Sequence, residues 1–112
     1  MDSREALRIL LEAVGYHVSV AGDGRNAVDI ALAERPDLIL MDIMMPEVDG
    51  FEATRRLRAD VSMDGVPIIA VTAMEGAHDR ALRAGATTVM PKPIDARALL
   101  GAIQDLLGEE SG

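Results

Sequence analysis

The chain has 112 residues, of which 49% are apolar and only 2% aromatic, with a formal net charge of −8 and no cysteine. This length suits one domain whose core is filled by Leu, Ile, Val, Ala and Met side chains. The acidic balance argues against direct nucleic-acid binding, which needs a basic surface. We find no apolar run of the roughly 18 residues that span a bilayer, no secretory leader, and no thiol for disulfides or thiolate metal sites. These absences predict a cytoplasmic protein.

The first third of the chain alternates helix and strand signals. Asp2 and Glu5 have the spacing of a capping box, and apolar residues at helical spacing follow until Gly15. Residues 17–21 are rich in β-forming side chains and predict a short strand. A second helix follows, which ends before Pro36 because the residue preceding a proline disfavours helical backbone.

The remainder of the chain continues this alternation. Three further strands are predicted, over 37–42, 67–72 and 86–90. The first two are apolar on both faces, as parallel strands covered by helices require. Three further helices are predicted, over 51–59, over 76–83, and between the Asp95 cap and Gly108. The order αβαβαβαβα predicts an α/β domain with four parallel strands, five helices, and helices on both faces of the sheet.

Three polar residues are associated with the ends of successive strands: Asp42, Thr72 and Lys92. Because parallel strands end on one edge of a sheet, these side chains are expected to converge there. A carboxylate can attack phosphorus to give an acyl phosphate, and a hydroxyl and an ammonium can bind the phosphoryl oxygens. Each residue alone is common at such a position, so the hypothesis depends on their joint placement. His17 and His78 have no companion at metal-ligand spacing and are interpreted as ordinary surface or packing residues.

These three residues lie in the motifs LILMDIMMPEVDG, VTAM and GATTVMPKPID, with which the chain resembles the receiver domain of two-component response regulators over essentially all 112 residues. The resemblance implies a flavodoxin-like fold with strand order 2-1-3-4-5, and a phosphorelay signalling module rather than an enzyme. It implies that Asp42 accepts a phosphoryl group from a histidine kinase or phosphotransfer protein. Thr72 is then the switch hydroxyl and Lys92 the phosphoryl contact, followed by a cis Lys92–Pro93 bond.

The resemblance also implies an Mg²⁺ site formed by Asp42 and the backbone carbonyl of Met44, and a tight backbone path that needs Gly50. The family, however, begins with an apolar strand that ends in two acidic residues. This chain begins at Met1-Asp2, already at the helix cap, so the strand and its acidic pair are missing. Mg²⁺ prefers six oxygen ligands, so the expected site lacks carboxylates unless Asp2 supplies one.

Two further consequences follow from these departures. Without the central strand the sheet has unpaired edges, and three solutions remain open. The strand over 17–21 pairs directly with that over 37–42, a partner's strand fills the gap, or two copies exchange elements as a homodimer. Val89 stands where the family has Tyr or Phe, whose ring swings inward on activation. The conformational signal then passes through the loops after Thr72, or signalling does not depend on phosphate.

The leading hypothesis is therefore a receiver domain over residues 1–112, truncated at its N-terminus relative to the family. It accepts a phosphoryl group on Asp42 and relays the signal by conformational change or dimerisation. The alternative is a phosphorylation-independent interaction or dimerisation module without metal-dependent chemistry. A small-molecule enzyme is disfavoured, because the sequence has no glycine-rich phosphate loop and no Ser–His or Cys–His pair.

Overall fold

The computed structural model describes residues 4–17, 23–43, 49–74 and 76–108. The helices in these residues are α1 (Arg4–Ala13), α2 (Gly24–Glu34), α3 (Gly50–Arg58), α4 (Ala77–Ala84), α5 (Ala96–Leu107) and a short 3₁₀ helix, η1 (Val61–Met63). The strands are β1 (Ile39–Asp42), β2 (Ile68–Thr72) and β3 (Thr88–Pro91). The predicted helices and the last three predicted strands are confirmed with small differences at their ends, whereas η1 was not predicted. The strand predicted over 17–21 lies, apart from His17, outside the described residues.

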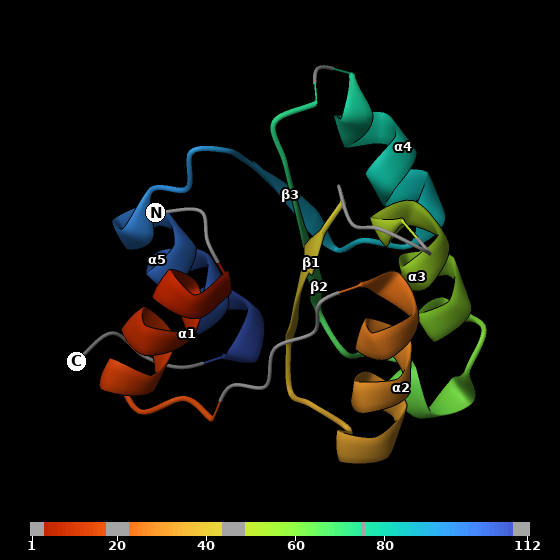
Figure 1. The fold of residues 1–112 in the computed structure, drawn as a ribbon, viewed down its shortest axis with the longest axis horizontal. Coiled ribbons are helices and arrows are strands. Elements are labelled where there is room, and N and C mark those ends of the chain that lie inside the picture. Colours follow the sequence, from red (N-terminus) through yellow and green to blue (C-terminus); the bar gives the residue numbers. More distant parts are fainter. Residues whose placement is uncertain (1–3, 18–22, 44–48, 75, 109–112) are drawn as a thin grey trace.

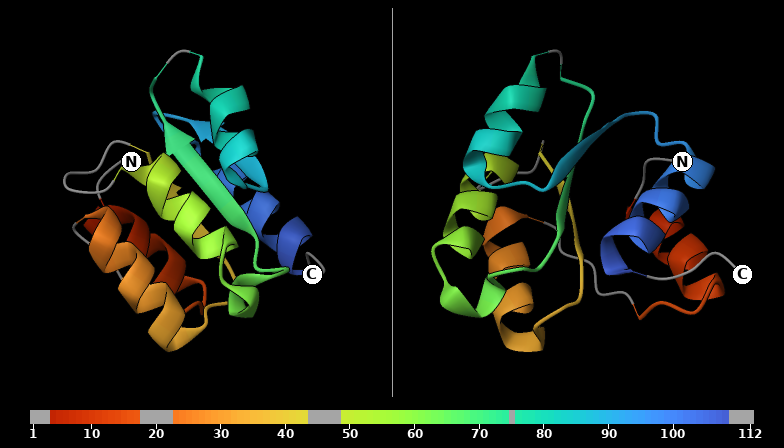
Figure 2. Two further views of the ribbon diagram at one scale, coloured as in Figure 1. Left: turned by 90° about the vertical axis from the view of Figure 1, so that its right-hand side faces the viewer. Right: turned by 180° about the vertical axis from the view of Figure 1, so that it is seen from behind.

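The three strands form a parallel sheet in the order β1-β2-β3. Ile39 pairs with Ile68 at the start of β1, and Thr72 pairs with Pro91 at the end of β3. Figure 1 shows α1 and α5 on one side of this sheet and α2, α3 and α4 on the other, and the view from behind in Figure 2 agrees. The parallel sheet with helices on both faces is thus confirmed for the described residues.

The core consists of two apolar clusters, one on each face of the sheet. Strand β2 contributes to both, because successive residues of a strand point to opposite faces. Ile68 and Ala70 belong to the first cluster, while Ile69 and Val71 belong to the second. All five residues of β2 are buried, so this strand is the centre of the described structure.

Helix α1 attaches to the second cluster through Leu11, which is 6% exposed. On its outer side Arg8 contacts Glu5 and forms an ion pair of 3.0 Å with Glu12. The hydrogen bond from Arg8 lowers the pKa of Glu5, and Glu5 in turn raises the pKa of Arg8. The capping role predicted for Asp2 falls outside the described residues.

Helices α2, α3 and α5 begin at aspartate caps, of which the sequence predicted the one at Asp95. The carboxylates of Asp23, Asp49 and Asp95 accept hydrogen bonds from backbone N–H groups in the first turns of α2, α3 and α5. Such bonds satisfy donors that a helix start would otherwise leave unpaired. At η1, hydrogen bonds from the Ser62 hydroxyl and N–H lower the pKa of Asp60.

Arginine side chains connect α3 to the elements beside it. The Arg80 guanidinium lies 4.0 Å from the ring centre of Phe51. Arg58 donates hydrogen bonds to the Gly85 carbonyl at 2.8 Å, the Met63 carbonyl at 3.0 Å and the Thr87 hydroxyl at 3.3 Å. Arg58 therefore connects the end of α3 to η1 and to the turn between α4 and β3.

Strand β1 has one neighbour, β2, within the described part of the chain. The predicted pairing of 37–42 with 17–21 involves residues outside that part. The three solutions for completing the sheet therefore stay open.

Candidate functional site

The candidate site lies where the strands end, and its best-defined contact joins Asp42 to Lys92. Asp42 is the last residue of β1, and Lys92 follows β3 directly. The Lys92 Nζ lies 3.1 Å from the Asp42 Oδ2, and the two side chains are 22% and 23% exposed. Because β2 separates the two strands, the lysine side chain must extend past the end of β2 to reach the carboxylate. The pair is thus shielded enough for its charges to interact, yet open enough to meet an incoming group.

Thr72 lies on the same edge, at the end of β2, and is 5% exposed. Its hydroxyl oxygen accepts a hydrogen bond of 2.8 Å from the Met74 N–H. Its backbone carbonyl accepts one of 3.0 Å from the Lys92 N–H, and the Lys92–Pro93 bond is cis, as the resemblance implies. The structure therefore brings Asp42 and Lys92 into contact and attaches Thr72 to the loop that follows β2.

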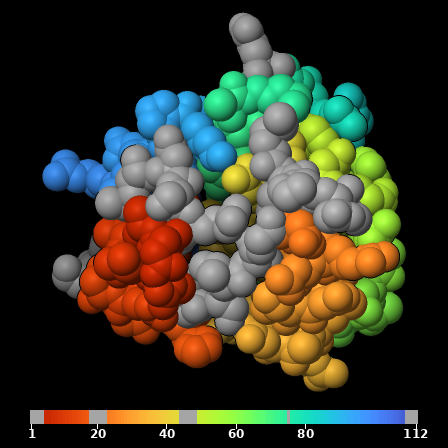
Figure 3. Space-filling model, viewed as in Figure 1, coloured from red at the N-terminus to blue at the C-terminus, as the bar shows by residue number. Residues whose placement is uncertain are grey.

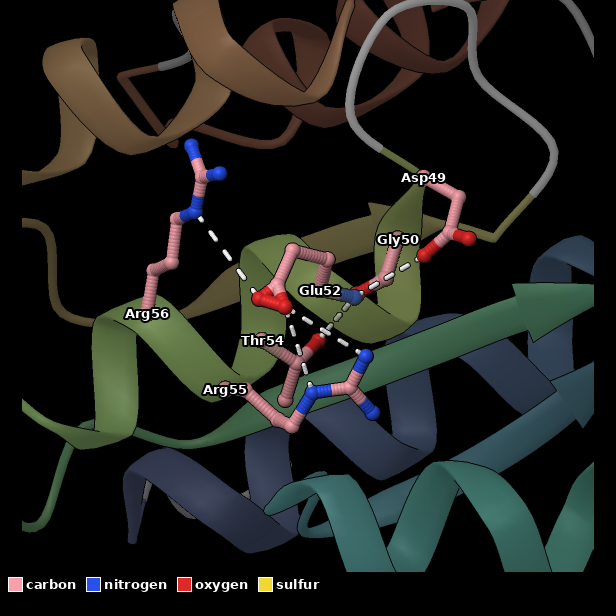
Figure 4. A network of polar contacts seen from close by, with 6 residues as sticks. All are labelled: Asp49, Gly50, Glu52, Thr54, Arg55 and Arg56. Carbon is pink, nitrogen blue, oxygen red and sulfur yellow. Dashed lines mark hydrogen bonds and ion pairs between the residues drawn. The ribbon is translucent and has the colours of Figure 1, made fainter.

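Helix α3 begins against the segment that follows Asp42. The Gly50 N–H donates to the Ile43 carbonyl at 3.0 Å, and the Asp49 carboxylate accepts from the Glu52 N–H at 2.9 Å. Figure 4 shows this helix start, with the Glu52 carboxylate between the guanidinium groups of Arg55 and Arg56. The resemblance implies that Gly50 permits a tight backbone path. In the structure Gly50 is the first helical residue and has no positive φ.

Val89 lies on β3, paired with Ala70, and its partly buried side chain packs against the first core cluster. The position thus holds an aliphatic side chain in the core. It has no ring that could move between an exposed and an inward position.

The donor set for a metal ion is small in the part of the chain that the structure describes. No group of three or more His, Asp or Glu residues there could hold an ion. Of the predicted ligands Asp42 is described, while Met44 and Asp2 lie outside. One carboxylate that already contacts an ammonium does not fit the near-octahedral oxygen shell of Mg²⁺. The described residues alone therefore do not form a magnesium site.

The strand ends reach the molecular surface. In Figure 3 a small yellow area, from the end of β1, is visible between green atoms of the segment after β2 and light blue atoms of the segment after β3.

Among the described residues, no helix is both long enough and apolar enough to cross a membrane.

A parallel sheet covered on both faces, with an aspartate and a lysine in contact at its carboxyl edge, defines the class of receiver-like α/β domains. The comparisons with known proteins agree. The response regulator receiver domain family matches residues 1–104. The response regulator MprA of Mycolicibacterium vanbaalenii is 42% identical over 106 residues, which are 93% of this chain and 45% of MprA. The polar-differentiation response regulator DivK of Brucella anthropi is 41% identical over 104 residues, 91% of this chain and 85% of DivK.

Solved structures show the same fold. The receiver domain of the sensor histidine kinase PA1611 from Pseudomonas aeruginosa has a TM-score of 0.87 and 36% identity, covering 95% of this chain and 88% of that one. That structure has a magnesium ion coordinated in its active site cleft. The chemotaxis protein CheY4 of Vibrio cholerae has a TM-score of 0.85 and 30% identity, covering 92% and 88% of the two chains.

The chain belongs to the response regulator receiver domain family of two-component signalling. Members of this family interact with histidine kinases or phosphotransfer proteins and typically bind Mg²⁺. The chain spans about half the length of the MprA relatives that it matches.

Proposed function

We propose that residues 1–112 form a receiver domain that accepts a phosphoryl group on Asp42 from a histidine kinase or phosphotransfer protein in the cytoplasm. The observation that supports this most directly is the 3.1 Å contact between the Lys92 ammonium and the Asp42 carboxylate at the ends of two parallel strands. An ammonium beside a nucleophilic carboxylate is placed to bind the oxygens of a phosphoryl group on that carboxylate.

In the proposed reaction an Asp42 carboxylate oxygen attacks the phosphorus of a phosphohistidine. The new O–P bond forms while the N–P bond breaks, and the imidazole leaves with the electron pair of that bond and takes up a proton. Lys92 compensates the charge on the phosphoryl oxygens, which is where transferring groups need stabilisation. The product is an acyl phosphate on Asp42.

Thr72 is proposed as the switch hydroxyl. Its oxygen accepts the Met74 N–H, while its own hydrogen is available for donation to a phosphoryl oxygen. A rotation of Thr72 toward the phosphoryl group would release the Met74 N–H and alter the loop after β2. With Val89 in place of an aromatic ring, this loop is the proposed output route, by conformational change or dimerisation.

Mg²⁺ is the proposed cofactor, because the solved receiver domain of PA1611 has a magnesium ion coordinated in its active site cleft. Asp42 is the ligand within the described residues, and the Met44 carbonyl and Asp2 are the further proposed ligands. When bound, the ion would supply positive charge to the phosphoryl oxygens.

The second candidate function is an interaction or dimerisation module that does not depend on phosphorylation. It is favoured by the small set of metal ligands among the described residues. Titration with Mg²⁺ separates the two functions. The phosphoacceptor requires binding that is lost in Asp42→Asn, whereas the interaction module binds no Mg²⁺ and still associates with its partner.

The direct test is to incubate the protein with Mg²⁺ and a small acyl phosphate and to measure the intact mass. We expect one added phosphoryl group, absent in Asp42→Asn and retained in the matched control Asp37→Asn, which alters an exposed carboxylate before β1. Lys92→Met is expected to lower the initial rate about 100-fold, the usual effect of removing one charge-stabilising group. An unmodified parent protein would refute the proposed phosphoacceptor.

A further inference from the structure

Gly50 is the residue of α3 that lies against the backbone of the proposed phosphoacceptor. A Cβ atom built on Gly50 would lie 2.5 Å from the Asp42 carbonyl oxygen, 2.6 Å from the Ile43 Cα and 3.0 Å from the Asp42 carbonyl carbon. Contacts this short require a displacement, and all three atoms belong to the backbone. The position therefore has no room for any other side chain unless the segment at Asp42 moves.

The backbone conformation of Gly50 does not explain the glycine. It is the first helical residue of α3 and is absent from the residues with positive φ. Glycine weakens a helix relative to alanine, so a glycine here carries a cost in helix stability. Close approach of two backbone segments is the remaining physical reason for it.

Helix α3 is packed into the core, so a shift away from a larger residue at position 50 would disrupt buried contacts. Phe51, Ala53 and Leu57 are between 0% and 2% exposed. The Thr54 hydroxyl donates to the Gly50 carbonyl at 2.7 Å within the helix. The Asp49 cap holds the first turn, as Figure 4 shows.

Asp42 is held from the other side as well. It pairs with Val71 in the sheet, and the Ile43 N–H donates to the Val71 carbonyl at 3.1 Å. The segment at Asp42 thus lies between β2 and the start of α3. A side chain on Gly50 would displace this segment and with it the carboxylate that now lies 3.1 Å from Lys92.

We propose that Gly50 is a positioning residue for phosphoryl acceptance. The space beside the Asp42 carbonyl, which a Cβ on Gly50 would occupy, lets the backbone at Asp42 lie close to α3 and direct its carboxylate toward Lys92. This role depends on the proposed function, and it acts through Asp42 without contact to the phosphoryl group.

The test compares Gly50→Ala with the matched control Gly85→Ala. A Cβ on Gly85 would lie 2.3 Å from the Arg58 Cγ, and Gly85 has φ +119°, so this substitution is also strained. Gly85 lies before β3, at the opposite end of the sheet from Asp42. Both variants are expected to lose stability, whereas only Gly50→Ala affects the phosphoacceptor.

The rate of acyl phosphate formation is measured with Mg²⁺ and a small acyl phosphate, at a temperature where circular dichroism shows each variant fully folded. We expect Gly50→Ala to lower the initial rate at least about tenfold and Gly85→Ala to change it less than about twofold. In ¹H–¹⁵N spectra the amides of Asp42 and Ile43 should shift in Gly50→Ala and stay in place in Gly85→Ala.

If the parent protein is phosphorylated and a folded Gly50→Ala variant is phosphorylated at the same rate, the role of Gly50 is overturned and the proposed function stays intact. A parent that gains no phosphoryl group would overturn the proposed function and this role together.

If Gly50→Ala does not fold, Asp49→Ala serves instead, since it removes the capping hydrogen bond of the first turn of α3 without adding bulk. The phosphorylation rate of Asp49→Ala should be about threefold lower than that of the parent, and Asp49→Asn should restore the parent rate. Asp60→Ala, which removes the cap of η1, should react at the parent rate. Equal rates in Asp49→Ala and the parent would overturn the proposal.

Discussion

Arg58 offers the clearest test of how the fold is held together. Its guanidinium donates to the carbonyls of Gly85 and Met63 at 2.8 and 3.0 Å, both partly buried, and to the exposed Thr87 hydroxyl at 3.3 Å. Hydrogen bonds from a charged donor contribute roughly 1.5–3 kcal/mol when buried, and less when water competes. Taking about 1 kcal/mol for each partly buried bond, and little for the third, we expect Arg58→Met to cost about 2 kcal/mol.

The measurement is urea unfolding followed by far-UV circular dichroism at one temperature. Arg58→Lys should cost less than Arg58→Met, about 1 kcal/mol, because an ammonium can reach one of the acceptors but not all three. Arg56→Met is the matched control on the same helix. Its ion pair with Glu52, at 3.9 Å, is exposed and should contribute less than about 0.5 kcal/mol. Equal unfolding midpoints for Arg58→Met and Arg56→Met would refute the reasoning.

Three further predictions follow from the structure. A double-mutant cycle of Asp42→Asn and Lys92→Met should give a coupling free energy of about 1 kcal/mol that decreases with salt, and zero coupling would contradict the contact at 3.1 Å. Leu57→Ala, at a side chain 0% exposed, should cost about 2–4 kcal/mol in urea unfolding, whereas Val61→Ala, at a side chain 81% exposed, should cost less than about 0.5 kcal/mol. Hydrogen bonds lower the pKa of Asp60, so its carboxylate stabilises the fold above the ordinary aspartate pKa and loses this contribution as the pH falls through its lowered value. The urea midpoints of the parent and Asp60→Asn should therefore converge in acid. A difference between the midpoints that increases as the pH falls would contradict this prediction.

The secondary structure could be predicted because the chain changes its hydrophobic period clearly at each element. The apolar run that ends at Asp42 predicted a buried parallel strand, and β1 ends at that residue. The contact between Asp42 and Lys92 could be anticipated for a topological reason, since parallel strands end on one edge. The roles of these residues in phosphoryl transfer stay predictions until the mass measurements are made.

Other features could not be read from the sequence, because they depend on distances between remote segments. Arg58 lies 27 positions before Gly85, and no local pattern distinguishes it from the exposed arginines of α3. The sequence likewise cannot tell whether a glycine is needed for a left-handed backbone or for space. At Gly50 the expected tight path proved to be a close approach to Asp42. The bond from Met74 to the Thr72 hydroxyl depends on the loop geometry after β2.

The placement of β2 has a consequence for how this domain opens. Since neighbouring residues of β2 pack into opposite core clusters, one layer of helices in the described part of the chain cannot separate from the sheet without disturbing the strand that supports the other layer. Amide protons of Ile69 and Ala70 should therefore exchange with solvent together, and only when the whole domain unfolds. A protease would then cleave these segments only after global unfolding of the domain, and not after local unfolding of one helix layer.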